Sequence, residues 1–250
     1  MSEVTVIILG KSVPVTLPAD VEPVMFSTML KVYKPFCEWC EGVDENLDIR
    51  SLTVQSVDYF GTRIGFLKFS AEAYSKIHGQ RVPGVVFMRG GSVAVLPILI
   101  NDQTGEKYIV LTEQARVPVG KASFLEIPAG MLDENGDLIG VAMQEMAEET
   151  GISLKRSDLH SLGSYYTSPG GSDELLALYY TEKSVSKDFI DGLAGKLTGV
   201  GPHERIVVRI TKLARSLEKL TDGKSLLAIL LYDRLSSSQN TTSIPSTEAG

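Results

Sequence analysis

Apolar and polar residues alternate along the chain in short runs rather than in long blocks. The apolar runs are rich in β-branched residues and bounded by glycine, proline, asparagine or aspartate, which is typical of strands joined by turns. In the first 82 residues this pattern predicts a small β-rich subdomain that also contains a helix over residues 22–40. We expect its strands at residues 4–9, 13–17, 52–57 and 62–69.

A valine–proline–glycine turn at residues 82–84 separates this subdomain from a second region, residues 83–235. Strands and helices interleave there, so we expect an α/β or α+β fold in which a mixed β-sheet is sandwiched between helices. The strands that we expect are residues 85–88, 93–100, 108–112, 124–127, 162–167, 174–181 and 206–210.

Helical and irregular segments lie between and after these strands. Helical patterns cover residues 137–150, 213–220 and 225–235. The polar, glycine-rich stretch 184–204 predicts a loop. The tail, residues 236–250, is rich in serine, threonine and asparagine, which predicts disorder.

Composition and charge narrow the classes of partner. The chain has 250 residues, 43% hydrophobic and 22% charged, which is ordinary for a soluble globular protein. Its formal net charge of −7 does not attract nucleic acid or an anionic membrane, so we expect neither partner. No apolar run reaches the roughly 18 residues of a membrane span. Residues 1–4 show neither a secretory signal nor the start of an Arg/Ser-rich transit peptide.

The two cysteines stand close together, at Cys37 and Cys40. Two thiols cannot form a disulfide framework. A zinc site would need two further ligands, and the histidines available are His78, His160 and His203. A redox or metal role stays open, and the alternative is two reduced thiols on a helical stretch.

Three glutamates gather at the end of the helix predicted over residues 137–150. Glu145, Glu148 and Glu149 are spaced i, i+3 and i+4, so they share one helix face. They repel one another and lie at the negative end of the helix dipole, since Gly151 is a typical helix stop. The arrangement favours hard cations, which can bridge a diphosphate and generate a hydroxide nucleophile. The alternative is a solvated acidic face.

The spacing of these residues resembles the Nudix box, G-x5-E-x7-R-E-U-x-E-E-x-G-U, in which U is a bulky apolar residue. Counting Gly130 as the first position, Glu145 is sixteenth, Glu148 nineteenth, Glu149 twentieth and Gly151 twenty-second. The resemblance implies a loop–helix–loop that holds Mg²⁺ or Mn²⁺ and hydrolyses nucleoside diphosphates linked to another group. The two bulky apolar positions are occupied by Met146 and Ile152.

Two positions depart from the box. Its first glutamate is replaced by Gly136, with Glu134 and Asp137 nearby, and its arginine is replaced by Gln144. In the family that arginine commonly orients a carboxylate, and glutamine donates a hydrogen bond without the charge. The departures put the rate in doubt, but they leave the three glutamates intact.

Three further stretches resemble the ADP-ribose and ADP-sugar diphosphatase branch of the family. They are the E-x-P-A-G run within residues 125–132, the E-Q-x-R run at residues 113–116 and the proline within residues 168–170. The likeness covers roughly residues 85–210 and is strongest to plant plastidial enzymes that act on ADP-glucose and ADP-ribose. It implies a plastid location and a homodimer in which residues 1–82 form the interface and help to shape the pocket.

The resemblance also assigns roles to single residues. Glu145 and Glu149 are the expected metal ligands, with Glu148 as a third ligand or as a group that only supports the ligands. In the resembling branch the carbonyl of Ala129 faces a metal as well. Glu204, which stands where bacterial relatives carry their base, is expected to orient or deprotonate the attacking water, and the alternative is a surface charge at a strand entry.

Two more residues are candidates for binding the substrate. Arg116 could grip a phosphate in bidentate fashion, or form a surface salt bridge. Glu126 could hydrogen-bond the substrate or a metal-bound water, or be a surface acid at a strand end. We therefore expect an Mg²⁺-dependent ADP-sugar diphosphatase. The alternatives are a hydrolase of UDP-sugars or other nucleoside diphosphate derivatives, a catalytically silent nucleotide-binding domain, and an interaction protein that uses its N-terminal region.

Overall fold

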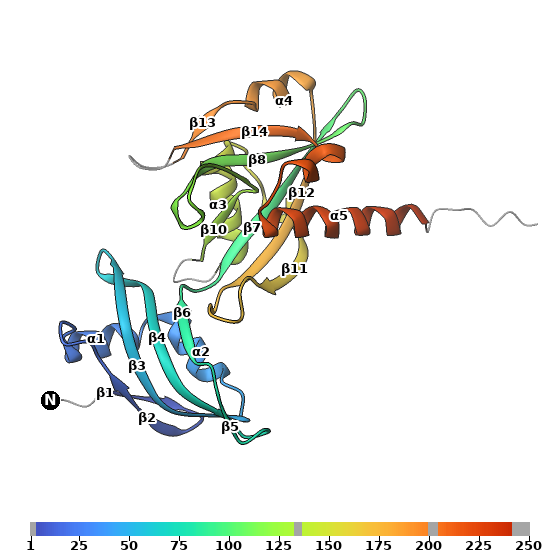
Figure 1. The fold of residues 1–250 in the computed structure, drawn as a ribbon. Helices are drawn as coiled ribbons and strands as arrows, with labels where there is room; N and C mark the ends of the chain where they lie inside the picture. Colours follow the sequence, from blue (N-terminus) through green and yellow to red (C-terminus); the bar gives the residue numbers. More distant parts are fainter. Residues whose placement is uncertain (1–3, 133–136, 200–204, 242–250) are drawn as a thin grey trace, which may run out of the picture. The chain divides into compact units, whose positions relative to one another are not determined.

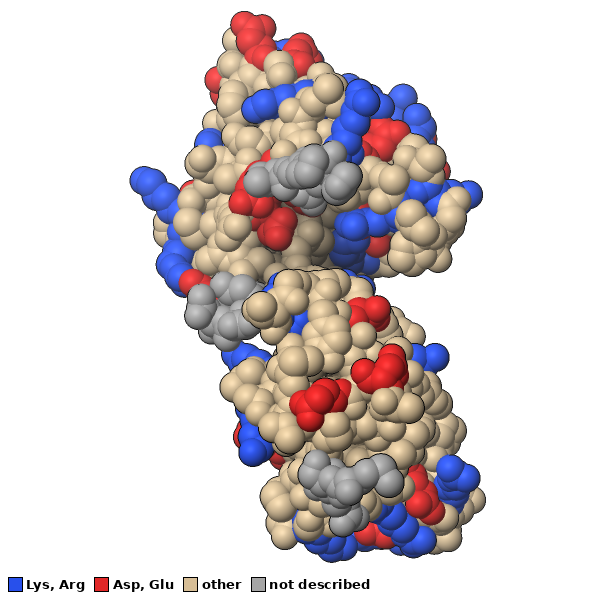
Figure 2. Space-filling view, turned by 90° about the vertical axis from the view of Figure 1, so that its left-hand side faces the viewer, with Lys and Arg blue, Asp and Glu red and all other residues tan. Residues whose placement is uncertain are grey.

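The computed structural model describes residues 4–132, 137–199 and 205–241, which divide into two compact units. Every strand that the apolar pattern predicts is present, and several are longer than expected. Basic and acidic side chains are interspersed over the faces that Figure 2 shows, in agreement with the modest net charge. Among the described residues, no helix combines the length and the apolar character needed to cross a membrane.

Unit 1, residues 1–91 and 165–175, is built on a six-stranded sheet (Figure 1). The strand order is β1-β2-β3-β4-β5, and β6 also pairs with β4. The long β3–β4 hairpin forms the centre of this sheet, and its inward residues are buried with those of β1 and β2. The strands are β1 (Val4–Ile8), β2 (Lys11–Thr16), β3 (Leu47–Phe60), β4 (Arg63–Ser75), β5 (Gln80–Val82) and β6 (Val85–Met88).

Two helices replace the single helix expected over residues 22–40. They are α1 (Pro23–Leu30) and α2 (Lys34–Gly42). Tyr33 between them is extended, and Pro35 lies in the first turn of α2. Proline has no N–H to continue an earlier helix but fits the first turn of a new one, so the chain breaks at this point.

Unit 2, residues 92–164 and 176–250, is built on an eight-stranded mixed sheet. The order is β11-β12-β7-β8-β14-β13, with β10 paired to β7 and β9 to β8. The β7 and β12 strands run parallel, whereas β8 is antiparallel to both β7 and β14. The strands are β7 (Ser92–Asn101), β8 (Lys107–Arg116), β9 (Lys121–Glu126), β10 (Ala129–Met131), β11 (His160–Tyr166), β12 (Leu175–Val185), β13 (Leu197–Thr198) and β14 (Ile206–Lys212).

Helices cover both faces of this sheet (Figure 1). On one face α3 and α4 share a core with the β7 side chains Val93 and Val95. The β7 side chains that point the other way, Leu96 and Ile98, are also buried, and α5 contacts β7 there. The sheet between helices confirms the expected fold class. The helices are α3 (Leu138–Thr150), α4 (Lys187–Leu193) and α5 (Gly223–Thr241), with short 3-10 turns η1 (Val117–Val119), η2 (Arg156–Asp158) and η3 (Leu213–Glu218).

The loop expected over residues 184–204 is wrong in part, because α4 and β13 lie within it. The Ser186 side chain caps α4 by accepting a hydrogen bond from the Phe189 amide at 3.2 Å. Ile190 and Leu193 are buried in the α3 core, which supplies the stability that the local sequence lacks. The helix was not predicted because the stretch is rich in glycine, which is typical of loops.

The C-terminal region also differs from expectation. The helix predicted over residues 213–220 is the 3-10 turn η3, and α5 continues to Thr241, beyond the expected start of the tail at residue 236. The Ser237 and Ser238 hydroxyls donate to the carbonyls four residues earlier, so these serines fit a helical turn. Residues 242–250 lie outside the described part of the chain.

Candidate active site

Both ends of α3 are fixed by contacts within unit 2. At its start, Asp137 accepts a hydrogen bond from the Gly140 amide at 3.1 Å and forms an ion pair with Arg156, and both contacts hold the Asp137 pKa below its usual range. At its end, Thr198 Oγ1 donates to the Glu149 carbonyl at 2.5 Å. The last carbonyls of a helix lack partners within the helix, so this contact fixes the turn that carries the glutamates.

The glutamates of α3 differ in their surroundings. Glu149 is 4% exposed, whereas Glu145 and Glu148 are half-buried. The Ala129 amide donates to Glu149 Oε2 at 3.2 Å, and Gln114 Nε2 lies 3.5 Å from Glu149 Oε1. Burial, followed by the charge of Glu145, raises the pKa of Glu149 to about 8. This carboxylate would therefore gain from a nearby positive charge.

Glu145 lies directly against β10, the short strand that precedes α3. A β-carbon on Gly130 would lie 1.9 Å from Glu145 Oε1, so only glycine leaves room for this carboxylate. Gly130 belongs to β10 together with Ala129, whose amide binds Glu149. The structure thus brings together three of the predicted metal ligands, Ala129, Glu145 and Glu149.

This group of oxygens suits a hard divalent cation. Mg²⁺ prefers carboxylate and carbonyl oxygens and usually keeps several waters. Among the described residues, no set of three or more carboxylate, imidazole or thiol side chains forms a complete metal site. A cation at Glu145 and Glu149 would therefore complete its coordination with the Ala129 carbonyl and with water.

Glu148 has a partner that compensates in part for the lost arginine of the motif. Gln144 Nε2 donates to Glu148 Oε1 at 2.9 Å. The amide supplies the orienting hydrogen bond but not the charge. The other departure, Gly136, lies outside the described residues, and its neighbour Asp137 is engaged at the start of α3.

The two candidate substrate-binding residues contact each other. Arg116 Nε donates to Glu126 Oε1 at 2.6 Å. Glu126 is only 3% exposed, so the alternative of a surface acid is wrong for this residue. Lys224 binds the other carboxylate oxygen, Oε2. The motifs gave no signal for Lys224, because it lies 98 residues further along the chain than Glu126.

The candidate base, Glu204, lies outside the described residues, so its role stays a prediction. The strand that follows it, β14, pairs with β8, which carries Gln114 and Arg116. The proline-bearing segment 168–170 belongs to unit 1, where Ser168 accepts hydrogen bonds from the amides of the turn that it begins.

Metal-free protein should lose stability as the pH rises, because the folded chain keeps a proton on Glu149 up to about pH 8. The unfolded chain releases that proton above the ordinary pKa of 4.5. The proton therefore contributes most below pH 4.5, and its contribution is lost as the pH rises to about 8, by at most about 1.4 kcal/mol per pH unit. We expect the Tm in EDTA to fall across this window and Glu149→Gln to flatten the fall. Parallel profiles for the two proteins would contradict this.

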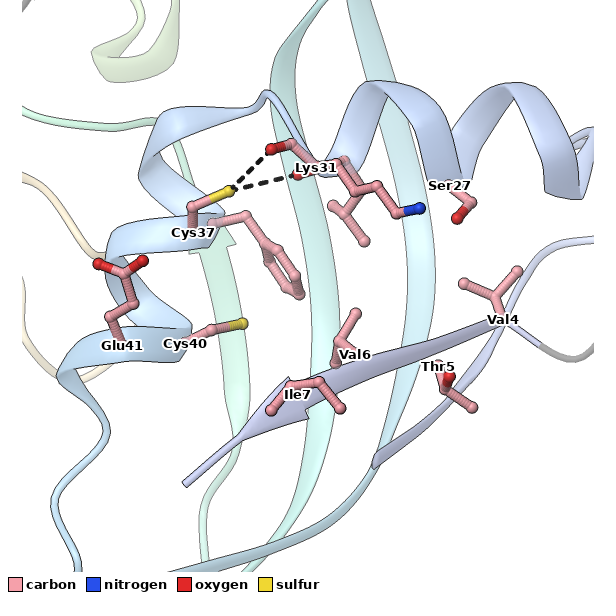
Figure 3. A pocket seen from close by; sticks show the side chains of 11 residues that line it. Val4, Thr5, Val6, Ile7, Ser27, Lys31, Cys37, Cys40 and Glu41 are labelled. Carbon is pink, nitrogen blue, oxygen red and sulfur yellow. Dashed lines mark hydrogen bonds between the residues drawn. The ribbon is translucent and has the colours of Figure 1, made fainter. Parts of the chain in front are cut away.

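The two cysteines line a hollow of about 320 Å³ in unit 1, between β1, α1 and α2 (Figure 3). Cys37 Sγ donates to the carbonyls of Leu30 and Lys31, at 3.6 and 3.4 Å, and so caps the end of α1. Both thiols are free, and burial raises the pKa of Cys37 and that of Cys40, the latter to about 12. Since reactive cysteines have lowered pKa values, the structure favours two reduced structural thiols.

Alkylation of the folded protein at pH 8 should therefore be slow. Only the thiolate reacts, so we expect Cys40 to react at least about a hundredfold more slowly than an ordinary cysteine. A time course with iodoacetamide, followed by peptide mass spectrometry, measures this rate, and protein unfolded in urea is the control. Rapid labelling of Cys40 in the folded protein would show that its thiol is activated.

Comparison with known proteins agrees with this geometry. The profile of the NUDIX domain matches residues 89–221. Nudix hydrolase 14, chloroplastic, of Arabidopsis thaliana is 45% identical over 201 residues, which cover 76% of this chain and 64% of that protein. The ADP-ribose pyrophosphatase of Bacillus subtilis (strain 168) is 36% identical over 93 residues, covering 37% of this chain and 46% of that protein. The chain thus spans less than two thirds of either relative.

A solved structure described as an ADP compounds hydrolase has a similar fold. Its TM-score to this chain is 0.57, and the match covers 80% of this chain and 98% of that one. The two share 16% sequence identity, so the likeness concerns the fold alone.

Proposed function

The chain belongs to the Nudix family, and from that premise we propose that it hydrolyses the diphosphate of ADP-sugars such as ADP-glucose and ADP-ribose, with Mg²⁺ or Mn²⁺ as its cofactor. One observation carries the proposal: Glu145 and Glu149, in the C-terminal half of α3, both contact the β10 residues Ala129 and Gly130. Oxygen groups placed in this way suit a hard cation, which is a common partner of phosphate oxygens. The choice of ADP compounds follows the name of the relative from Bacillus subtilis.

The reaction is the attack of water on one phosphorus of the diphosphate. It yields AMP and a sugar 1-phosphate from ADP-glucose, or AMP and ribose 5-phosphate from ADP-ribose. The cation, when bound, neutralises charge on the diphosphate and lowers the pKa of bound water. Glu145, Glu149 and the Ala129 carbonyl would hold the cation, and Glu148 would be a third side-chain ligand or would support the ligands. Glu204 orients or deprotonates the attacking water.

Arg116 binds a phosphate of the substrate. Its side chain is 39% exposed although its Nε is held by the buried Glu126. A guanidinium fixed in this way can bind two phosphate oxygens with its terminal nitrogens. Gln114 on the same strand acts indirectly, through its contact with Glu149.

One observation favours a second candidate, a catalytically silent domain that binds nucleotides. Gln144 replaces the charged residue that orients a carboxylate in the family motif, and its amide supplies only a neutral hydrogen bond to Glu148. Glu145 and Glu149 nevertheless contact Gly130 and Ala129 in an arrangement that suits a cation, and this supports a hydrolase.

The test is a panel of ADP-glucose, ADP-ribose, UDP-glucose and GDP-mannose with Mg²⁺, in which a phosphatase releases phosphate from the products. We expect the highest kcat/KM for an ADP-sugar. Faster hydrolysis of UDP-glucose would show that the substrate is a UDP-sugar, whereas the proposed reaction would stay the same. No release from any substrate, together with calorimetric binding of ADP-glucose, would support the silent domain.

We also propose a homodimer and a plastid location. Residues 1–82 would form the dimer interface, and the relative from Arabidopsis is named as chloroplastic. Light scattering should report about twice the chain mass of 27.1 kDa, and the chain mass itself would contradict a dimer. A fluorescent fusion of the full-length protein, imaged in plant cells, tests the location.

A further inference from the structure

Four charged side chains of unit 2 form a series of alternating sign between α5 and β8. Arg116 Nε donates to Glu126 Oε1 at 2.6 Å, and Lys224 binds Glu126 Oε2. Lys224 Nζ also lies 3.1 Å from Asp222 Oδ1, just before α5. The two acids and two bases balance, so the series carries no net charge.

One end of this series is far more exposed to solvent than the rest. The side chains of Glu126, Asp222 and Lys224 are 4%, 12% and 13% exposed, whereas that of Arg116 is 39% exposed. Removing charges from water is costly, and apolar replacements of buried ion pairs are often neutral or stabilising. We therefore expect the series to contribute little to the stability of the fold. Its exposed end, Arg116, is the part that can contact a ligand.

The contact with Glu126 leaves the terminal nitrogens of Arg116 available to bind a ligand. Its Nε is occupied by Glu126, and its terminal nitrogens make no hydrogen bond to another described residue. A guanidinium carries five N–H donors in a rigid plane, so fixing the Nε also fixes the direction of the rest. Gln114 lies two residues before Arg116 on β8, and its Nε2 is 3.5 Å from Glu149 Oε1, so the series lies near the predicted metal ligands.

The turn that carries Lys224 is itself hydrogen-bonded to residues 126–129, the segment between Glu126 and the predicted ligand Ala129. Ser225 Oγ accepts a hydrogen bond from the Ile127 amide at 2.8 Å, and the Ser225 amide donates to Asp222 Oδ2 at 3.1 Å. Ile127 directly follows Glu126 and lies two residues before Ala129. The first turn of α5 is thus hydrogen-bonded to the residue that follows Glu126.

We propose that Lys224 is a positioning residue for substrate binding, which holds Glu126 so that Glu126 fixes the Arg116 guanidinium toward one phosphate of a nucleoside diphosphate. This inference rests on the proposed function. Without Lys224, the second oxygen of Glu126 is free to take a further N–H of Arg116, and the phosphate loses that donor. The contacts of Glu145 and Glu149 remain, so the loss falls on KM rather than on kcat.

The experiment compares Lys224→Met with Lys224→Arg and with a control, Lys212→Met. Lys212 forms an exposed ion pair with Glu106, so its replacement removes the same kind of charge without touching the series. With saturating Mg²⁺ and ADP-ribose, we expect Lys224→Met to raise KM about tenfold and to change kcat by less than about threefold. Lys224→Arg should restore most of the KM, and the control should match the wild type. A wild-type KM for Lys224→Met, with only a lower Tm, would overturn the inference.

A double-mutant cycle tests whether Lys224 acts through Arg116. In an Arg116→Ala background, Lys224→Met should raise KM no further, whereas independent effects would multiply and overturn the inference. Should Lys224→Met fail to fold, Glu126→Gln/Lys224→Met removes the buried pair together. This double variant should still show the raised KM, because a neutral amide that Lys224 no longer holds fixes the Arg116 guanidinium less firmly than the carboxylate does, and a wild-type KM would overturn the inference.

The outcome for the wild type separates this inference from the proposed function. A wild-type protein that hydrolyses no nucleotide sugar would contradict the proposed function, and the inference with it. An active wild type whose KM does not depend on Lys224 would contradict the inference alone.

Discussion

Replacing Glu149 by glutamine should lower kcat for ADP-sugar hydrolysis by at least about a hundredfold, since loss of a group that binds or supports a catalytic metal costs 10–100-fold or more. Glu149 is a buried carboxylate of α3 that the Ala129 amide fixes at 3.2 Å. Glutamine keeps the shape but cannot carry the negative charge that a cation requires. The loss should fall on metal binding and chemistry, with little change in the contacts of the substrate.

The same substitution should not unfold the protein. Burial raises the pKa of Glu149 to about 8, so the metal-free chain already holds a neutral group there at neutral pH. We expect an equal or higher Tm in EDTA for Glu149→Gln, and a smaller rise in Tm on addition of Mg²⁺ than in the wild type. Glu218→Gln, at an exposed site in η3, is the matched control. A Glu149→Gln protein with more than a tenth of the wild-type kcat would refute its role as a metal ligand.

A single methyl group at Gly130 should be nearly as damaging. A β-carbon there would lie 1.9 Å from Glu145 Oε1, so the carboxylate must move away. Moving the end of a flexible side chain costs little folding energy, and Gly130 is not among the glycines with a left-handed backbone. We therefore expect Gly130→Ala to fold with a Tm close to that of the wild type and to lose about a hundredfold in kcat, as Glu145→Gln should.

Gly192→Ala is the matched control for this variant. Nothing lies within 4 Å of a β-carbon at Gly192, so the same substitution should leave activity unchanged. The kcat of each variant is measured across a range of Mg²⁺ concentrations, because a displaced ligand weakens metal binding. Full activity of Gly130→Ala at limiting Mg²⁺ would show that the position of Glu145 against β10 does not matter to the reaction.

Much of the fold could be predicted because strands and helices leave periodic patterns in the sequence. The short β-branched runs predicted the strands of both sheets except the short β5, β10 and β13, and α3 covers the predicted range 137–150 to within one residue and ends before Gly151 as expected. The errors arose where stability comes from distant partners. α4 was missed because Ile190 and Leu193 are stabilised by the α3 core. The break in the first predicted helix is different, because Pro35 is a local signal that the sequence already contained.

The sequence by itself determined which residues can carry the chemistry: the spacing of Glu145, Glu148 and Glu149 on one helix face follows from the helical repeat alone. Only the tertiary structure decided the environment of each. It buried Glu149 under the Ala129 amide, placed Glu145 against Gly130, and joined Lys224 to Glu126. These contacts depend on the pairing of strands and on the docking of α5, which join residues far apart in the chain, whereas a motif records only spacing along it.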